Sequence, residues 1–218
     1  MIYAIFSYVI GGLMNQDFNL PQDLVLLISG VPGVGKTTIS YELLKRYEEF
    51  RIVEETDIIR EILRGYNTYI SSEYKLEPDN IYPHDIFLSY DMAKQQCQIM
   101  KESILNIINR QKRKKIPTII NGVHIIPEEL YLCTPHSNVL FINLYIDSME
   151  ALWKRLKHRN PEKYTTDCLP ILYQTNKELN NSLQFISRNF CKAYSVNVTN
   201  LTIEETLSVI HEIFCALY

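Results

Sequence analysis

The residues with the clearest chemical signature form one glycine-rich run, Gly30 to Thr37, with the sequence GVPGVGKT. The run satisfies the pattern G-x-x-x-x-G-K-[ST] of phosphate-binding loops. In such a loop the glycines let successive backbone amides converge on phosphate oxygens, and the positive end of the following helix faces the same anion. The run therefore predicts a P-loop that binds ATP or a related nucleoside triphosphate.

The loop residues have separate expected roles. Lys36 adds a mobile cation at the β- and γ-phosphates, which makes it a catalytic candidate as well. Thr37 offers a hydroxyl to Mg²⁺, so we expect ATP and Mg²⁺ as cofactors. The candidates for nucleotide binding are Gly30, Val31, Pro32, Gly33, Val34, Gly35, Lys36, Thr37 and Thr38.

Phosphoryl transfer also needs an acceptor hydroxyl that is held in line and relieved of its proton, which calls for a carboxylate near the end of a second strand. Asp57, in the segment EETDIIRE, is the candidate. It could take the acceptor's proton, or hold Mg²⁺ through water. Glu54 and Glu55 compete for both tasks, and a plain helix cap is the structural alternative for Asp57.

Further cations and one histidine are expected near the same crevice. Arg60 and Arg64 lie one helical turn apart, where they could bind a phosphate or carboxylate of the acceptor; solvated surface arginines are the alternative. Arg155 and Arg159 also stand four residues apart and are catalytic candidates that could reach the ATP phosphates. His124 follows a predicted strand and is a candidate for substrate binding, with a structural histidine as the alternative.

Alternating apolar runs and helical patterns must position these residues. Buried strands are predicted at 24–29, 51–55, 116–120, 138–146 and 194–198, with helices at 36–49, 57–64, 85–111, 149–158, 170–193 and 203–216 and a polar loop at 66–83. This order predicts a three-layer α/β P-loop kinase fold with a mostly parallel sheet of about five strands. Ligands of such sheets bind beyond the carboxyl ends of the strands, where every candidate above falls.

Length and composition predict a single domain. A chain of 218 residues with 46% hydrophobic content buries one sizeable core and leaves little for a second. We expect the P-loop domain at 21–218, preceded by an apolar extension at 1–20. Its uncharged stretch, Ile2 to Met14, is too short to span a membrane and lacks the pattern of a secretory signal. The stretch packs on the domain, or translation begins at Met14.

Charge and cysteine usage narrow the partners. A formal charge of -3 gives no global positive field for nucleic acid or a membrane, and the basic run Lys112 to Lys115 suits the carbonyl end of a helix. The expected partners are a nucleoside triphosphate and a small anionic metabolite, without nucleic acid or membrane. Five widely spaced cysteines without CxxC pairs indicate buried thiols in a reducing, cytoplasmic setting. The sequence does not indicate an oligomeric state.

The chain resembles the archaeal-type 2-phosphoglycerate kinases, within the wider group of P-loop small-molecule kinases. The likeness runs from about Leu24 to Phe214 and rests on GVPGVGKTT, on TDIIRE at 56–61, on GVH at 122–124 followed by Ile126-Pro127, and on the spacing of Arg155 and Arg159. This resemblance implies transfer of the γ-phosphate of ATP to a hydroxyl of a small phosphorylated acid, with Asp57 as the base on the acceptor side. Asn121 is a departure, because the family usually has glutamate there.

Other functions share the P-loop. A polynucleotide-end or tRNA kinase would need a basic groove, for which only Lys112 to Lys115 offers material. A toxin kinase acting on a sugar-nucleotide would share the P-loop and Asp57. A nucleotide-binding regulatory protein with little turnover would retain Lys36 but lack a working base.

Overall fold

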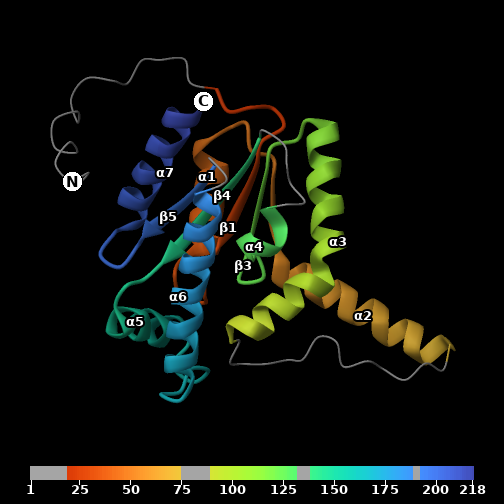
Figure 1. Ribbon diagram of the computed structural model, residues 1–218, viewed down its shortest axis with the longest axis vertical. Coiled ribbons are helices and arrows are strands. Elements are labelled where there is room, and N and C mark those ends of the chain that lie inside the picture. The colour runs from red at the N-terminus through yellow and green to blue at the C-terminus, as the bar shows by residue number, and fades with distance from the viewer. Residues whose placement is uncertain (1–18, 75–88, 132–137, 189–191) are drawn as a thin grey trace.

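A parallel sheet of five strands forms the centre of the molecule (Figure 1). The computed structural model describes residues 19–74, 89–131, 138–188 and 192–218, and for 68–74 only the backbone. The strand order is β2-β3-β1-β4-β5, and every pairing is parallel. The bounds are β1 (Val25–Ser29), β2 (Ile52–Glu55), β3 (Thr118–Gly122), β4 (Val139–Tyr145) and β5 (Ala193–Asn197). The central strands β1 and β3 are buried throughout, as their continuous apolar runs predict.

Helices cover both faces of this sheet. On one face α1 and α7 pack together, and on the other α3, α4 and α6 are in contact (Figure 1). The helices are α1 (Lys36–Arg46), α2 (Thr56–Tyr74), α3 (Tyr90–Lys114), α4 (Pro127–Leu130), α5 (Met149–Arg159), α6 (Cys168–Ser187) and α7 (Ile203–Leu217). The predicted three-layer α/β fold is confirmed, and the sheet is entirely rather than mostly parallel.

Helix α2 is the largest departure from the predicted elements. The loop predicted from residue 66 is wrong up to Tyr74, because α2 continues through that stretch and runs away from the sheet in Figure 1. Ile59 and Leu63 give the helix an inward face at a spacing of four, and Gly65 does not interrupt it. The rest of that predicted loop lies outside the described residues.

Three smaller differences concern the ends of two helices and one short helix that was not predicted. Helix α1 ends at Arg46 instead of residue 49, because Tyr47 is extended and its ring packs edge-on against Phe214. The predicted helix at 170–193 ends at Ser187, since Ala193 already pairs with Phe141 in the sheet. The short α4 was not predicted, and a proline at its first position starts it.

The cysteine prediction holds for only part of the chain. Cys97 and Cys168 are buried as expected, but Cys215 is exposed on α7, so the expectation of a buried thiol is wrong there. Cys133 and Cys191 lie outside the described residues, as does nearly all of the predicted extension at 1–20. Within the described part of the chain, no helix is both long and apolar enough to cross a membrane.

Candidate active site

The P-loop joins the end of β1 to the start of α1, as the motif requires. Gly30, Gly33 and Gly35 have φ angles of 143°, 90° and 99°, a region that side chains rarely adopt. A Cβ on Gly30 would lie 2.5 Å from the carbonyl oxygen of Leu144, so the backbone can turn there only with glycine. Helix α1 begins at Lys36, and its first amides therefore face the interior of the loop.

Lys36 is folded back onto this loop. Its Nζ donates a hydrogen bond to the backbone oxygen of Val31 at 3.0 Å. Burial lowers the pKa of Lys36 to about 8, while Asp57 and Glu55 favour its charged form and Arg159 opposes it. The ammonium group thus lies within electrostatic reach of two carboxylates, in the position where a phosphate would replace the carbonyl as its partner.

A cleft with a volume of about 770 Å³ opens beside the loop. Its walls come from the P-loop, from α5 and from the segment that follows β5. Its lining combines cations with apolar side chains, a combination that suits a nucleotide's phosphates and base. The lining residues are Gly33, Val34, Gly35, Lys36, Thr37, Thr38, Ile39, Glu55, Lys154, Arg155, His158, Arg159, Val198, Leu201, Thr202, Ile203 and Thr206.

Sequence reasoning missed the apolar side chains that line this cleft, Val198, Leu201 and Ile203. A signal for them was present, because they follow β5 at the same carboxyl edge of the sheet as the P-loop. Lys154 and His158 were also missed; they lie on α5 among the predicted arginines.

The two arginines predicted on α5 both line the cleft but have different partners. Arg155 donates to the backbone oxygens of Val198 and, at 3.4 Å, of Thr199, and burial lowers its pKa. Among the described residues, the side chain of Arg159 has neither a hydrogen bond nor an ion pair. Arg155 therefore fixes the segment after β5, whereas Arg159 is available to a phosphate.

Asp147 holds the same segment from the other side. Its carboxylate accepts hydrogen bonds from Asn197 and from the hydroxyl of Thr199, both at 2.7 Å. These hydrogen bonds lower the pKa of Asp147, which keeps it charged. These hydrogen bonds connect the ends of β4 and β5 next to Val198, which lines the cleft.

A buried corner between β2, β3 and α2 lies next to Asp57. Thr56 and His124 share a hydrogen bond between Oγ1 and Nδ1 at 2.9 Å. His124 is fully buried, which lowers its pKa to about 4 despite the nearby Asp57, so the ring is neutral at pH 7. A Cβ on Gly122 would lie 1.7 Å from Thr56 Oγ1, so glycine there leaves the space that Thr56 occupies.

His124 itself does not line the cleft. Its Nδ1 lies 3.8 Å from an oxygen of Asp57, behind that carboxylate. This placement fits the structural alternative for His124, and direct contact with a substrate stays a prediction.

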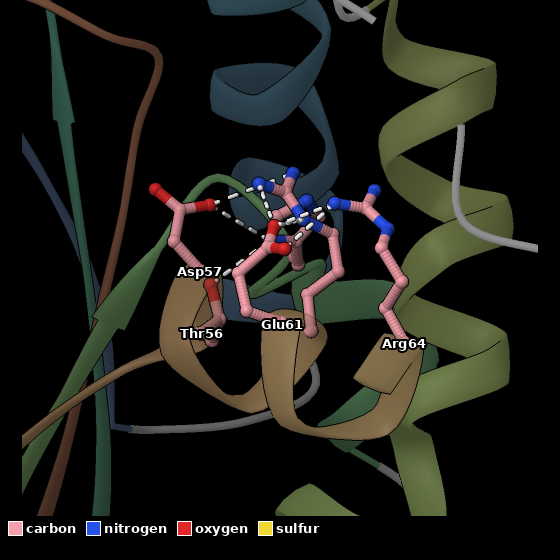
Figure 2. Close-up of polar contacts among 6 residues, drawn as sticks. Thr56, Asp57, Glu61 and Arg64 are labelled. Atoms are coloured by element: carbon pink, nitrogen blue, oxygen red, sulfur yellow. Dashed lines mark hydrogen bonds and ion pairs between the residues drawn. The ribbon is translucent and has the colours of Figure 1, made fainter. Parts of the chain in front are cut away.

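Asp57 and two arginines gather on the first turns of α2 (Figure 2). The Asp57 side chain is 61% exposed and lies 3.7 Å from Arg60. Glu61 pairs with both arginines, at 3.2 Å to Arg60 and 2.8 Å to Arg64. The helix begins at Thr56, so Asp57 stands inside its first turn, where the helix dipole favours a negative charge.

Arg60 and Arg64 are partly exposed. Their side chains are 19% and 18% exposed and are held in ion pairs, and binding of an anionic substrate group stays a prediction for both. Although burial raises the pKa of Glu61, hydrogen bonds and charge from Arg64 and Arg60 lower it overall. The structure thus brings the predicted base and both predicted anion-binding arginines together on α2, with Asp57 within electrostatic reach of Lys36.

Comparison with known proteins agrees with the fold and the P-loop. The family model described as AAA domain (AAA_18) matches residues 26–180, most of the chain. The chain belongs to this family. It is similar to the 2-phosphoglycerate kinases of Thermococcus kodakarensis (27% identity, 65% of this chain and 51% of the relative) and of Methanococcus maripaludis strain C6 (28% identity, 87% and 64%). The predicted resemblance to archaeal 2-phosphoglycerate kinases is confirmed.

The AAA-domain chain spans between half and two thirds of the length of these curated relatives. Among solved structures, its fold is similar to that of a gluconokinase from Sinorhizobium meliloti 1021, with a TM-score of 0.57, 15% identity, and 91% of this chain and 94% of that chain covered. Family, fold and P-loop together make the chain a P-loop kinase domain that binds nucleotide.

The residues of this domain also fit Mg²⁺. Thr37 lines the cleft in the first turn of α1, and its hydroxyl has no hydrogen-bond partner among the described residues. A threonine hydroxyl suits Mg²⁺, which shares its oxygen ligands between protein, phosphates and water.

Proposed function

We propose that the chain transfers the γ-phosphoryl group of ATP to a hydroxyl of a small phosphorylated or acidic metabolite, with 2-phosphoglycerate as the first candidate. One observation carries the proposal: the exposed carboxylate of Asp57 lies within electrostatic reach of Lys36 and 3.7 Å from Arg60, on the helix that also carries Arg64. The arginines match an anionic group on the acceptor, and Asp57 is placed to receive its hydroxyl proton. The similarity to 2-phosphoglycerate kinases supports the same acceptor class.

Each group of the site has its own role in the proposed phosphoryl transfer. The acceptor's hydroxyl oxygen attacks the γ-phosphorus while its proton moves to the Asp57 carboxylate. The bond between the γ-phosphorus and the bridging oxygen breaks, and ADP leaves. Lys36 and Arg159 neutralise charge on the phosphate oxygens. Mg²⁺, when bound through Thr37, supplies further neutralisation at the β- and γ-phosphates.

The ion pairs of α2 indicate how an anionic acceptor would bind. Arg60 and Arg64 now share the carboxylate of Glu61, so each is already paired with an anion. A phosphate or carboxylate of the acceptor would replace or join Glu61 as their partner with little reordering of the guanidinium groups. This preorganisation favours a small planar or tetrahedral anion over a neutral sugar.

The nucleic-acid alternative has little support from the placement of charge. Lys112 to Lys115 form the end of α3 and lead into the start of β3, so they lie at the amino end of the sheet. The P-loop lies at the opposite, carboxyl edge. The position of this run at the end of α3 is explained by the helix dipole, which favours cations there, without a nucleic-acid site.

A substrate panel tests the proposal. The purified chain would be incubated with Mg²⁺, labelled ATP and one acceptor at a time: 2-phosphoglycerate and other phosphorylated acids, gluconate, nucleosides, sugar-nucleotides and 5′-hydroxyl RNA. Label should pass to a phosphorylated acid. Labelling of RNA or of a sugar-nucleotide instead would reject the proposed acceptor class, and no labelling with any acceptor would favour a regulatory protein.

Asp57→Asn refines the test. Asparagine keeps the shape of aspartate but loses the favourable interaction with the helix dipole, so stability should fall by at most about 1 kcal/mol, and its amide cannot take a proton. We expect kcat to fall on the order of 10²- to 10⁴-fold with nucleotide affinity nearly unchanged. Near-normal kcat with the true acceptor would reject Asp57 as the base.

A further inference from the structure

A histidine and a cysteine lie together on α7, outside the cleft. His211 and Cys215 stand four residues apart, which places them on the same side of the helix. Both residues are exposed, and neither lines the cleft. Cys215 Sγ lies 3.5 Å from His211 Nε2. A thiol and an imidazole at this spacing are the side chains that zinc prefers as ligands.

The distance between the two atoms suits a shared zinc ion. Zinc binds a thiolate sulfur at about 2.3 Å and an imidazole nitrogen at about 2.0–2.1 Å, in tetrahedral geometry. Two such ligands on one ion therefore lie about 3.6 Å apart. The 3.5 Å between Sγ and Nε2 matches this value, so a metal can replace the thiol proton with little movement of either side chain.

Tyr47, which follows α1, orients the imidazole from its other nitrogen. The Tyr47 Oη lies 2.7 Å from His211 Nδ1. Burial raises the pKa of Tyr47 to about 12, so at pH 7 the group is a neutral hydroxyl that can accept a hydrogen bond from Nδ1–H. In that tautomer the lone pair of Nε2 points toward Cys215. Histidine ligands of metals almost always have such a partner at the second ring nitrogen.

Aromatic packing between α1 and α7 holds this tyrosine in place. Tyr47 is buried, and its ring packs edge-on against Phe214 with centroids 5.3 Å apart and against Phe50 with centroids 6.3 Å apart. The imidazole therefore has a fixed neighbour that sets its orientation before a metal arrives. Such preorganisation lowers the entropy cost of binding.

The described part of the chain supplies two ligands and no more. Within it, no third histidine, cysteine or acidic side chain joins the pair. Water would fill the other positions around a tetrahedral ion, as it does at open zinc sites. Mg²⁺ and Ca²⁺ do not suit the pair, because both ions prefer oxygen ligands.

We propose that His211 Nε2 and Cys215 Sγ form a surface site for Zn²⁺, with Tyr47 as the positioning residue behind the imidazole. On binding, the S–H bond of Cys215 breaks and its proton passes to solvent, while the thiolate and imidazole lone pairs bond to the ion. No electron is transferred. The site is independent of the proposed kinase activity.

Metal titration without nucleotide tests the proposal. The purified, reduced chain and its variants would be titrated with Zn²⁺ in competition with a chromophoric chelator, and with Co²⁺, whose bond to a thiolate gives a charge-transfer band in the near ultraviolet. The wild type should bind Zn²⁺ and show this band with Co²⁺. Cys215→Ser and His211→Gln should each weaken Zn²⁺ binding at least about 10-fold, and Cys215→Ser should lose the band.

Tyr47→Phe separates the positioning role from the ligands. It keeps the aromatic packing and removes Oη, so Zn²⁺ binding should weaken on the order of 10-fold while the Co²⁺ band remains. Zn²⁺ affinity equal to that of the wild type would reject Tyr47 as a positioning residue.

Glu212→Gln is the matched control, since it changes an exposed residue of the same helical turn and removes a negative charge outside the pair. It should bind Zn²⁺ as the wild type does. Zn²⁺ should also raise the Tm of the wild type and of this control, but not that of Cys215→Ser. Equal Zn²⁺ affinity in the wild type and Cys215→Ser, persistence of the Co²⁺ band in Cys215→Ser, or an equal loss of affinity in Glu212→Gln would overturn the inference.

Discussion

Gly122→Ala should loosen the corner that carries Asp57. The added Cβ would lie 1.7 Å from Thr56 Oγ1, 2.8 Å from its Cβ and 3.1 Å from its Cγ2. Turning the Thr56 side chain relieves the first and third contacts but not the second, because the Cβ is fixed by the backbone. The start of α2 must therefore move away from β3.

Two effects set the size of the loss. Overpacking of a buried site costs about 1–3 kcal/mol. Displacing Thr56 also breaks its hydrogen bond to His124 and leaves a buried ring nitrogen unpaired, which costs about 1–3 kcal/mol more. The sum of about 2–6 kcal/mol corresponds to a fall in Tm of about 5–20 °C for a chain of this size.

Thermal unfolding of four variants checks this reasoning. Gly65→Ala is the control: nothing lies within 4 Å of its added Cβ, and it should be neutral or stabilising by about 0.5–1 kcal/mol. Thr56→Ala removes Oγ1 and Cγ2, so Gly122→Ala should cost less in that background than in the wild type. Equal costs in both backgrounds, or a Tm for Gly122→Ala within a degree of the wild type, would refute the steric argument.

Four further outcomes follow from the site. Lys36→Ala should abolish phosphoryl transfer with Tm nearly unchanged, which wild-type turnover would contradict. Thr37→Ala should raise the Mg²⁺ concentration needed for half-maximal activity, and undiminished activity in excess chelator would reject a metal role. Because the pKa of Lys36 is about 8 without ligand, nucleotide binding at pH 8–9 should take up a proton, seen as a binding heat that depends on the buffer; Lys36→Arg should take up none. His124 resists protonation in the folded state down to a pH of about 4, whereas the unfolded chain protonates near 6.5, so the stability advantage of the wild type over His124→Gln should shrink by about 3 kcal/mol as pH falls from 6.5 to 4.

The sequence predicted the elements whose signals are local. The P-loop and the buried strands follow from short patterns, and β1, β4 and β5 lie within one or two residues of their predicted bounds. The predicted helix at 57–64 ended too early because polar and tyrosine residues around Tyr66 weaken the apolar pattern of α2. Ile59 and Leu63 of the helix pack on the core, while Ile58, Ile62 and Tyr66 are exposed.

Site residues were predictable where a motif names them and not where tertiary contacts decide. Arg155 and Arg159 stand four residues apart on α5 and look alike in the sequence. Only the fold shows that Arg155 donates hydrogen bonds to the backbone oxygens of Val198 and Thr199. The sequence predicted that His124 follows a strand near the crevice. Its burial behind Asp57 depends on the space that Gly122 leaves, which the sequence does not show. Such contacts join residues far apart in the chain and leave no local signal.

Thr56 explains how two carboxylates that are two residues apart can serve different partners. Glu55 is the last residue of β2 and faces the cleft, whereas Asp57 lies in the first turn of α2 and faces Arg60. The change of direction occurs at Thr56, which the space at Gly122 and the hydrogen bond to His124 hold in place. Displacement of Thr56 should therefore move both carboxylates together, whereas a substitution at Glu55 or at Asp57 should leave the other carboxylate in place.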